Sequence, residues 1–228
     1  MSDITEVQAC IFDVDGTLLD SMPVWDDIGE RYLTSLGISA REGLHDVLNT
    51  MSLEQGAVYL KEEYQIDKPI PQIVKEVLKI VSDFYRFEAP LKPGVKETLE
   101  WLSEKKIKMV IATSSNKELV EAALERNGVL QYFEQIYTCT EVGAGKDEPK
   151  IYLEAAKFLQ TKPENTAVFE DAIHAAESFF QRNLTILEAS KSDLRSLCIK
   201  KCCNRSVIFL AKFSQLLDTS SLFIVRSM

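Results

Sequence analysis

Two carboxylates near the start of the chain, Asp13 and Asp15, are spaced so that they could act on the same chemistry. They end an apolar run from Val7 to Phe12, and Gly16 follows them directly. An apolar run of this length, closed by Asp and Gly, predicts a buried strand that ends in a loop. Acids at such a strand end are costly unless a cation or a reaction uses them. The pair therefore predicts a site at the carboxyl end of the first strand, where open α/β sheets bind ligands.

Three further polar pieces come after predicted strands. The sequence Thr113-Ser114-Ser115 follows the apolar run 109–112, Lys146 lies in a loop before a helix, and Glu170-Asp171 follows the run 167–169. Each piece alone has an ordinary explanation as a turn, a helix cap or a solvated charge. All four pieces are predicted on the same edge of one sheet, however, and capping alone does not explain that joint placement.

Strands and helices alternate along the second part of the chain. Helical periodicity and apolar runs of strand length follow one another in a regular order. In chain order, the predicted elements are helix 95–105, strand 107–112, helix 117–126, strand 136–138, helix 151–159, strand 166–169, helix 173–180 and strand 184–187. This order predicts an α/β fold with a doubly wound parallel sheet, which is a Rossmann-like core.

Between the first strand and this alternation lies a stretch that is helical throughout. From Met22 to about Ala89, apolar residues recur at helical spacing in four successive segments; Pro23 suits a helix start, and Ser52 with Gln55 resembles a capping box. Four amphipathic helices in a row predict a helical bundle inserted after the first strand. The predicted domains are thus an α/β core of residues 1–21 and 90–228 and a helical cap of residues 22–89.

Composition and charge exclude several classes of protein. The formal net charge of −9 over 228 residues argues against a nucleic-acid partner, which requires a basic face. The start of the chain lacks the pattern of a signal peptide, and no apolar stretch reaches the length of a membrane span. The five cysteines are an odd number without paired-motif spacing, which favours reduced thiols. We therefore expect a cytoplasmic protein that acts on neither nucleic acids nor membranes.

The four pieces together resemble the four motifs of the haloacid dehalogenase superfamily. The stretch Asp13-Val14-Asp15-Gly16-Thr17-Leu18-Leu19-Asp20-Ser21 is similar to the first motif, Ile111-Ala112-Thr113-Ser114-Ser115 to the second, Lys146 to the third, and Val168-Phe169-Glu170-Asp171 to the fourth. The resemblance covers about residues 5–188 and is to the branch of capped phosphatases that includes β-phosphoglucomutase. It implies Mg²⁺-dependent hydrolysis of a small organic phosphomonoester through an aspartyl-phosphate intermediate.

The resemblance also assigns a role to each matched residue. The implied catalytic residues are Asp13 as nucleophile, Asp15 as general acid and base, Thr113 and Lys146. Those implied to bind the substrate are Gly16, Ser114 and Ser115, and Trp25 of the predicted cap is a further candidate. The implied Mg²⁺ site consists of Asp13, Asp15 through its backbone carbonyl, Asp171, and the adjacent Glu170. Oxygen ligands of this kind suit Mg²⁺.

Single residues distinguish the alternative functions. Dehalogenases of the superfamily lack a second acid two residues after the nucleophile, so Asp15 argues against that chemistry. The β-phosphoglucomutase branch carries a histidine ten residues after the second Asp, where this chain has Trp25, and a basic residue where Leu53 falls. Mutase activity is therefore a disfavoured alternative, and a non-catalytic binding protein with this fold is another. The expected partner is a small phosphorylated metabolite, and the expected state is a monomer or a weak dimer.

The end of the chain departs from the family pattern. The family carries small residues in the helix after the fourth motif, where this chain has Phe179 and Phe180. Residues 191–228 contain seven Lys or Arg against two Asp, and no glycine. These features raise the hypothesis that the segment 179–228 is altered relative to its relatives.

Overall fold

The computed structural model describes residues 7–162, 165–171, 187–188 and 198–199. The described residues form two compact units: one holds the chain up to Asp20 and from Pro90 onward, and the other is Ser21–Ala89. The predicted helix 173–180, the predicted strand 184–187 apart from Leu187, and the features proposed for 179–228 lie outside the described residues, with the exception of two short strands. These are β5 (Leu187–Glu188) and β6 (Cys198–Ile199), which pair antiparallel with each other.

Among the described residues, a four-stranded parallel sheet forms the centre of the first unit. Its order is β3-β2-β1-β4, with β1 at Ala9–Phe12, β2 at Lys108–Thr113, β3 at Ile136–Thr138 and β4 at Thr166–Phe169. The register places Phe12 beside Ile111 on one side and Phe169 on the other. Both the strands and their parallel pairing agree with the sequence, so the prediction of an α/β fold with a doubly wound sheet is confirmed.

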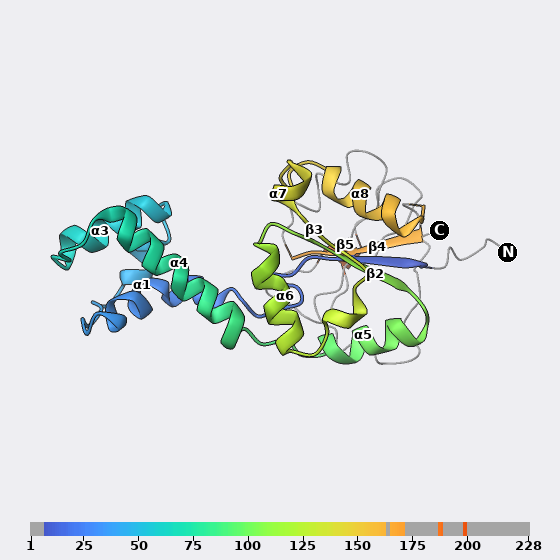
Figure 1. Cartoon of the computed structure of the whole chain (residues 1–228), viewed down its shortest axis with the longest axis horizontal. Helices are drawn as coiled ribbons and strands as arrows, with labels where there is room; N and C mark the ends of the chain where they lie inside the picture. Colours follow the sequence, from blue (N-terminus) through green and yellow to red (C-terminus); the bar gives the residue numbers. More distant parts are fainter. Residues whose placement is uncertain (1–6, 163–164, 172–186, 189–197, 200–228) are drawn as a thin grey trace. The chain divides into compact units, whose positions relative to one another are not determined.

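Helices cover both faces of this sheet (Figure 1). Helices α5 (Val95–Glu104) and α6 (Lys117–Arg126) lie on one face, and α7 (Cys139–Val142) and α8 (Lys150–Leu159) lie on the other. The apolar side of α8 packs onto β1, β2 and β4 in one buried cluster. Burying each large apolar side chain there stabilises the fold by about 1.5–3 kcal/mol. The members of this cluster are Ala9, Ile11, Val110, Ala112, Ile151, Tyr152, Ala155, Ala156, Leu159 and Val168.

The order of the strands creates an opening beside β1. The chain moves outward from β1 to β2 and β3, and β4 then pairs with the other edge of β1. Connections that leave adjacent strands in opposite directions part at the carboxyl ends of those strands, which is where such sheets bind ligands. Asp13 follows β1 and Glu170 follows β4, so both residues lie at this opening.

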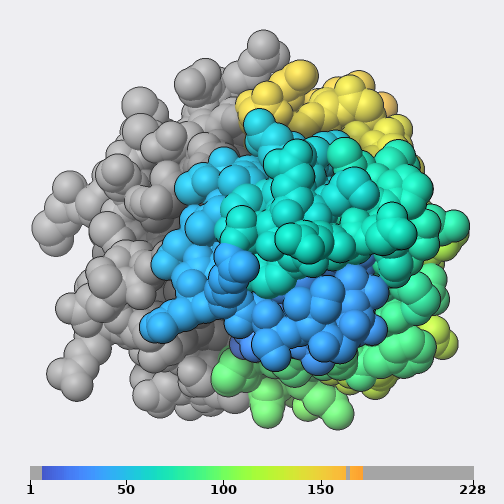
Figure 2. All heavy atoms as spheres, turned by 90° about the vertical axis from the view of Figure 1, so that its left-hand side faces the viewer, coloured from blue at the N-terminus to red at the C-terminus, as the bar shows by residue number. Residues whose placement is uncertain are grey.

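The second unit is a bundle of four helices. They are α1 (Pro23–Ser35), α2 (Leu44–Leu48), α3 (Leu53–Glu63) and α4 (Ile70–Phe87). A buried cluster that includes Leu33, Leu60, Ile73 and Val77 joins α1, α3 and α4. Figure 2 shows the side chains of these helices, coloured blue to teal, packed into a continuous surface. The bundle predicted after the first strand is therefore present, and none of the helices in the described ranges has the length and hydrophobicity to cross a bilayer.

Local signals in the sequence set the ends of these helices. Pro23 is the first residue of α1, and Ser52 precedes α3 as its N-cap. The Ser52 hydroxyl accepts a hydrogen bond from the Gln55 amide at 3.2 Å, and the Gln55 side chain accepts one from the Ser52 amide at 2.9 Å. These two bonds form the predicted capping box, which satisfies amides that the first turn leaves unpaired.

The segments that leave and re-enter the first unit run beside each other. The Asp20 amide donates to the Pro90 carbonyl, and the Lys92 amide donates to the Leu18 carbonyl, each at 2.9 Å. Leu19 and Leu91 form an antiparallel bridge between these two bonds. The helical unit is therefore inserted between two segments of the α/β unit that are hydrogen-bonded to each other.

Candidate active site

The carboxylate of Asp13 is buried at the end of β1. Only 4% of this residue is exposed, and its amide donates a 2.9 Å hydrogen bond to the Phe169 carbonyl, which continues the pairing of β1 with β4. The chain then turns sharply, because the amides of Leu18 and Leu19 both donate to the Val14 carbonyl at 2.9 Å. Sheet pairing thus fixes the backbone of Asp13, and the turn begins only after it.

Lys146 connects the ends of β1 and β4. Its ammonium forms an ion pair with Asp13 Oδ1 and a second one with Glu170 Oε2, the latter at 2.8 Å. The Lys146 side chain is 11% exposed, and Glu170 is 2% exposed. A buried carboxylate requires a nearby positive charge or hydrogen-bond donors. Lys146 provides both to two carboxylates that follow neighbouring strands.

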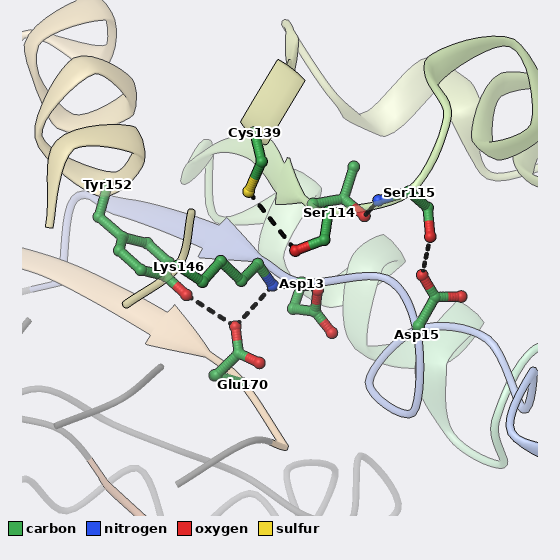
Figure 3. A network of polar contacts seen from close by, with 9 residues as sticks. Asp13, Asp15, Ser114, Ser115, Cys139, Lys146, Tyr152 and Glu170 are labelled. Carbon is green, nitrogen blue, oxygen red and sulfur yellow. Dashed lines mark hydrogen bonds and ion pairs between the residues drawn. The ribbon is translucent and has the colours of Figure 1, made fainter. Parts of the chain in front are cut away.

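Tyr152, on α8, adds a neutral donor to this group. Its hydroxyl donates to Glu170 Oε2 at 2.8 Å, and Figure 3 shows Tyr152 and Lys146 converging on Glu170. Sequence reasoning missed this residue, because Tyr152 fits the apolar side of the predicted helix 151–159. The available signal was chemical: a buried tyrosine hydroxyl almost always has a hydrogen-bond partner. We call Asp13, Lys146, Tyr152 and Glu170 the ionic group.

Burial shifts the protonation equilibria of the ionic group. Burial raises the pKa of Asp13 to about 8; Lys146 opposes this shift, whereas Glu170 and Asp15 add to it. Burial alone would lower the pKa of Lys146, but the carboxylates of Asp13 and Glu170 raise it overall. The pKa of Tyr152 is raised well above its ordinary value, first by burial and then by Glu170. Tyr152 and Lys146 therefore keep their protons near neutral pH and donate hydrogen bonds to Glu170.

Three carboxylates of this region could hold a divalent cation. Oxygen atoms of Asp13, Glu170 and Asp171 lie within 4.8 Å of one another. A Cβ atom added to Gly16 would overlap the Asp171 carboxylate, so a glycine at this position leaves room for that side chain. Gly16 also has a φ of +77°, which a residue with a side chain rarely adopts. A compact set of carboxylate oxygens fits Mg²⁺, which prefers hard oxygen ligands and retains waters.

A serine hydroxyl contacts the second predicted catalytic carboxylate, Asp15. Ser115 Oγ donates to Asp15 Oδ2, and the Ser115 amide donates to Thr113 Oγ1 at 3.0 Å. Thr113 is buried at the end of β2, whereas Ser115 and Asp15 are half-buried. Figure 3 shows the Asp15 side chain directed toward Ser115 and away from Glu170. We call Thr113, Ser115 and Asp15 the Asp15 cluster.

Two other predicted substrate-binding residues lie in different surroundings. Ser114 is exposed and adjoins the Asp15 cluster in the chain. Its Oγ is 3.4 Å from the Cys139 sulfur, a contact that sequence reasoning did not foresee. Cys139 begins α7, a short helix absent from the predicted elements, which Thr138 and Glu141 cap reciprocally. Trp25 lies on α1 of the helical unit and is 45% exposed. Its contact with a substrate stays a prediction.

The structure thus brings the pieces from the four strand ends to one edge of the sheet. Asp13 contacts Lys146, Lys146 contacts Glu170, and Glu170 and Asp13 share a possible cation site with Asp171. Asp15 contacts Ser115 of the second piece. One lysine and a set of acids that could hold a cation, next to a loop rich in hydroxyls, are suited to hold a phosphoryl group and neutralise its charge.

Comparison with known proteins agrees with this chemistry. The model of the haloacid dehalogenase-like hydrolase family matches residues 7–179. The chain is 30% identical to the phosphorylated carbohydrates phosphatase of Thermotoga maritima, over 75% of this chain and 80% of that protein. It is 27% identical to hexitol phosphatase B of Escherichia coli, over 76% and 79% of the two chains.

A solved structure supports the fold. The crystal structure of a proposed β-phosphoglucomutase from Thermotoga maritima superposes with a TM-score of 0.75, at 24% identity, and the match covers 93% of this chain and 98% of that one. The family model covers most of the chain, and the curated relatives are named as phosphatases. The chain therefore belongs to the haloacid dehalogenase-like hydrolases, as an enzyme of their phosphatase branch.

Proposed function

We propose that this protein hydrolyses a small organic phosphomonoester with the help of Mg²⁺, using Asp13 as the nucleophile. The observation that carries the proposal is the buried contact of Asp13 with Lys146 beside the carboxylates of Glu170 and Asp171. A phosphomonoester resists attack because its oxygens are negatively charged, so positioned positive charge is the main requirement for catalysis. Lys146 and a cation held by Asp13, Glu170 and Asp171 meet that requirement at one place.

The proposed reaction has two steps. The Asp13 carboxylate attacks phosphorus while the bond from phosphorus to the ester oxygen breaks, and Asp15 gives its proton to that leaving oxygen. Water then attacks the phosphorus of the aspartyl phosphate, Asp15 takes the proton of that water, and Asp13 is released with inorganic phosphate. When bound, Mg²⁺ supplies charge neutralisation to the phosphoryl oxygens. Thr113, the Ser114 backbone and Lys146 hold those oxygens in place.

A sugar phosphate or a related polyol phosphate is the proposed class of substrate. The two curated relatives described above are named for phosphorylated carbohydrates and for hexitol, which supports this class. The helical unit carries exposed Trp25, whose ring could contact the apolar face of such a substrate. The same unit is the proposed cap that would exclude water from the reaction.

An assay of phosphate release over a panel of phosphomonoesters tests this function. The panel includes hexose, pentose, hexitol and nucleoside monophosphates, each with Mg²⁺ and with excess chelator. We expect Mg²⁺-dependent release from at least one sugar phosphate and a loss of at least about a thousandfold in kcat for Asp13→Asn. Asp46→Asn is the matched control, because Asp46 is an exposed carboxylate on α2.

The other outcomes distinguish the alternative functions. Conversion of β-glucose 1-phosphate to glucose 6-phosphate without net phosphate release would replace the proposal with a mutase reaction. No turnover of any member by a folded protein, checked by circular dichroism, would favour a non-catalytic binding protein. Full activity of Asp13→Asn would rule out Asp13 as the nucleophile.

A further inference from the structure

The Tyr152 hydroxyl lies at the boundary between the hydrophobic core and the ionic group. The residue is 1% exposed, and it belongs to the buried cluster that joins α8 to β1, β2 and β4. Its hydroxyl nevertheless reaches a carboxylate that follows β4. Because the surrounding core packs closely against the ring, the position of the hydroxyl is fixed by the fold and not by the site.

Two donors meet at a single oxygen of Glu170. Tyr152 Oη and Lys146 Nζ each lie 2.8 Å from Glu170 Oε2, and Lys146 also pairs with Asp13 Oδ1. A carboxylate that accepts two hydrogen bonds from fixed donors is held in one orientation. Because the Tyr152 hydroxyl supplies one of the two hydrogen bonds to Glu170, the Lys146 ammonium can contact Glu170 and Asp13 at the same time.

We propose that Tyr152 is a positioning residue, whose hydroxyl orients Glu170 for divalent-cation binding and keeps Lys146 on Asp13. The inference deepens the proposed function and rests on it for its effect on turnover. Its effect on cation binding stands on the geometry of the described residues, because Glu170 belongs to the group of carboxylates that could hold the ion. Groups that orient metal ligands typically change metal affinity by about 10–100-fold when they are removed.

Tyr152→Phe removes the hydroxyl and leaves the ring in the core. The matched control is Tyr137→Phe, because Tyr137 packs against the same core cluster and its ring contacts Phe158 edge-on, away from Glu170. Calorimetric titration with Mn²⁺, in the absence of any substrate, reads the cation site directly. We expect about tenfold weaker Mn²⁺ binding for Tyr152→Phe, and binding within twofold of wild type for Tyr137→Phe.

Steady-state kinetics separate positioning from a general structural effect. With the substrate found in the panel, Tyr152→Phe is expected to lower kcat about tenfold at saturating Mg²⁺, whereas KM for the substrate changes less than twofold. Thermal unfolding of the two variants without metal is expected to differ by only a few degrees. A double variant supplies a further check: Tyr152→Phe should weaken Mn²⁺ binding little when Glu170 is already replaced in Glu170→Gln.

Several results would overturn the inference. These are unchanged Mn²⁺ binding in Tyr152→Phe, an equal loss in Tyr137→Phe, or a full additional loss in the Glu170→Gln background. Wild-type protein that binds no Mn²⁺ would also overturn it. Wild-type protein that binds Mn²⁺ but hydrolyses no phosphomonoester would instead refute the proposed function, and the substrate-free titration would still decide the role of Tyr152 in cation binding.

Discussion

The ionic group and the Asp15 cluster lie at the same sheet edge but differ in burial and in how their charges are compensated. In the ionic group, Asp13 and Glu170 are almost fully buried, and Lys146 compensates their charge inside the protein. In the Asp15 cluster, Asp15 is half-buried, and its carboxylate accepts a hydrogen bond from the neutral hydroxyl of Ser115. The ionic group therefore has a fixed arrangement of charges, whereas Asp15 is closer to solvent and has a neutral hydrogen-bond donor.

This difference matches the two tasks that the proposed reaction requires. Stabilising a transferring phosphoryl group needs charges that do not move while the reaction proceeds. A general acid and base must instead gain and lose a proton in each cycle, which is easier where water can reach it. Substitutions in the two groups are therefore expected to have different signatures, one in stability and cation binding and the other in proton transfer.

Removing the positive charge of the ionic group should have the largest effect. Lys146→Met leaves two buried carboxylates without their lysine, and we expect a loss of about 3–5 kcal/mol in the free energy of unfolding. Lys117→Met, which removes an exposed ion pair with Glu141 at 3.1 Å, should cost about 0–1 kcal/mol. Urea unfolding without metal measures both. Equal small losses would show that the ionic group is not the charge-compensated cluster described here.

The pH dependence of cation binding tests the protonation of Asp13. A divalent cation binds the deprotonated carboxylate, and burial raises the pKa of Asp13 to about 8. The affinity for Mg²⁺ should therefore rise with pH between pH 6 and pH 8, by at most about tenfold per pH unit, and level off above this range. In Asp13→Asn this rise should be much shallower. Titration calorimetry at several pH values measures it, and a flat profile in the wild type would contradict the shift.

The smallest expected effect is the loss of kcat on a substitution in the Asp15 cluster, and it depends on the substrate. If Ser115 orients Asp15 as the general acid, Ser115→Ala should lower kcat about tenfold for an alkyl phosphate, whose leaving oxygen requires a proton. For 4-nitrophenyl phosphate, whose leaving group departs without one, kcat should fall less than threefold. Mn²⁺ binding should stay within twofold of wild type. Equal losses with both substrates would assign Ser115 to phosphate binding instead.

Local patterns in the sequence predicted most of the described fold. The strands at 136–138 and 166–169 and the helix at 117–126 begin and end at the predicted residues, and the strand expected at 107–112 is shifted by one residue. Apolar runs and caps determine these elements within a few residues of chain, so they can be read without the tertiary structure. The four strand-end pieces could be placed on one edge because parallel strands share their direction.

The contacts that the sequence did not reveal all depend on how elements pack. Tyr152 reaches Glu170 only because of the rotation of α8 about its own axis over β1 and β4. The approach of Ser114 to Cys139 depends likewise on α7, which is too short to give a periodic signal. The pairing of Ser115 with Asp15 joins residues of two different loops. Side-chain distances of this kind follow from packing, which spacing along the chain does not encode.

The paired segments at Leu18–Asp20 and Pro90–Lys92 also bear on how such an enzyme can diversify. Their hydrogen bonds close the α/β unit at the insertion point, so the sequence between them is, for that unit, one large loop. Lengthening a loop whose ends are already held together costs little free energy, since the entropy of closure grows only logarithmically with length. Helical modules of different size and surface could therefore be exchanged between Asp20 and Pro90 during evolution, while the catalytic edge is inherited intact.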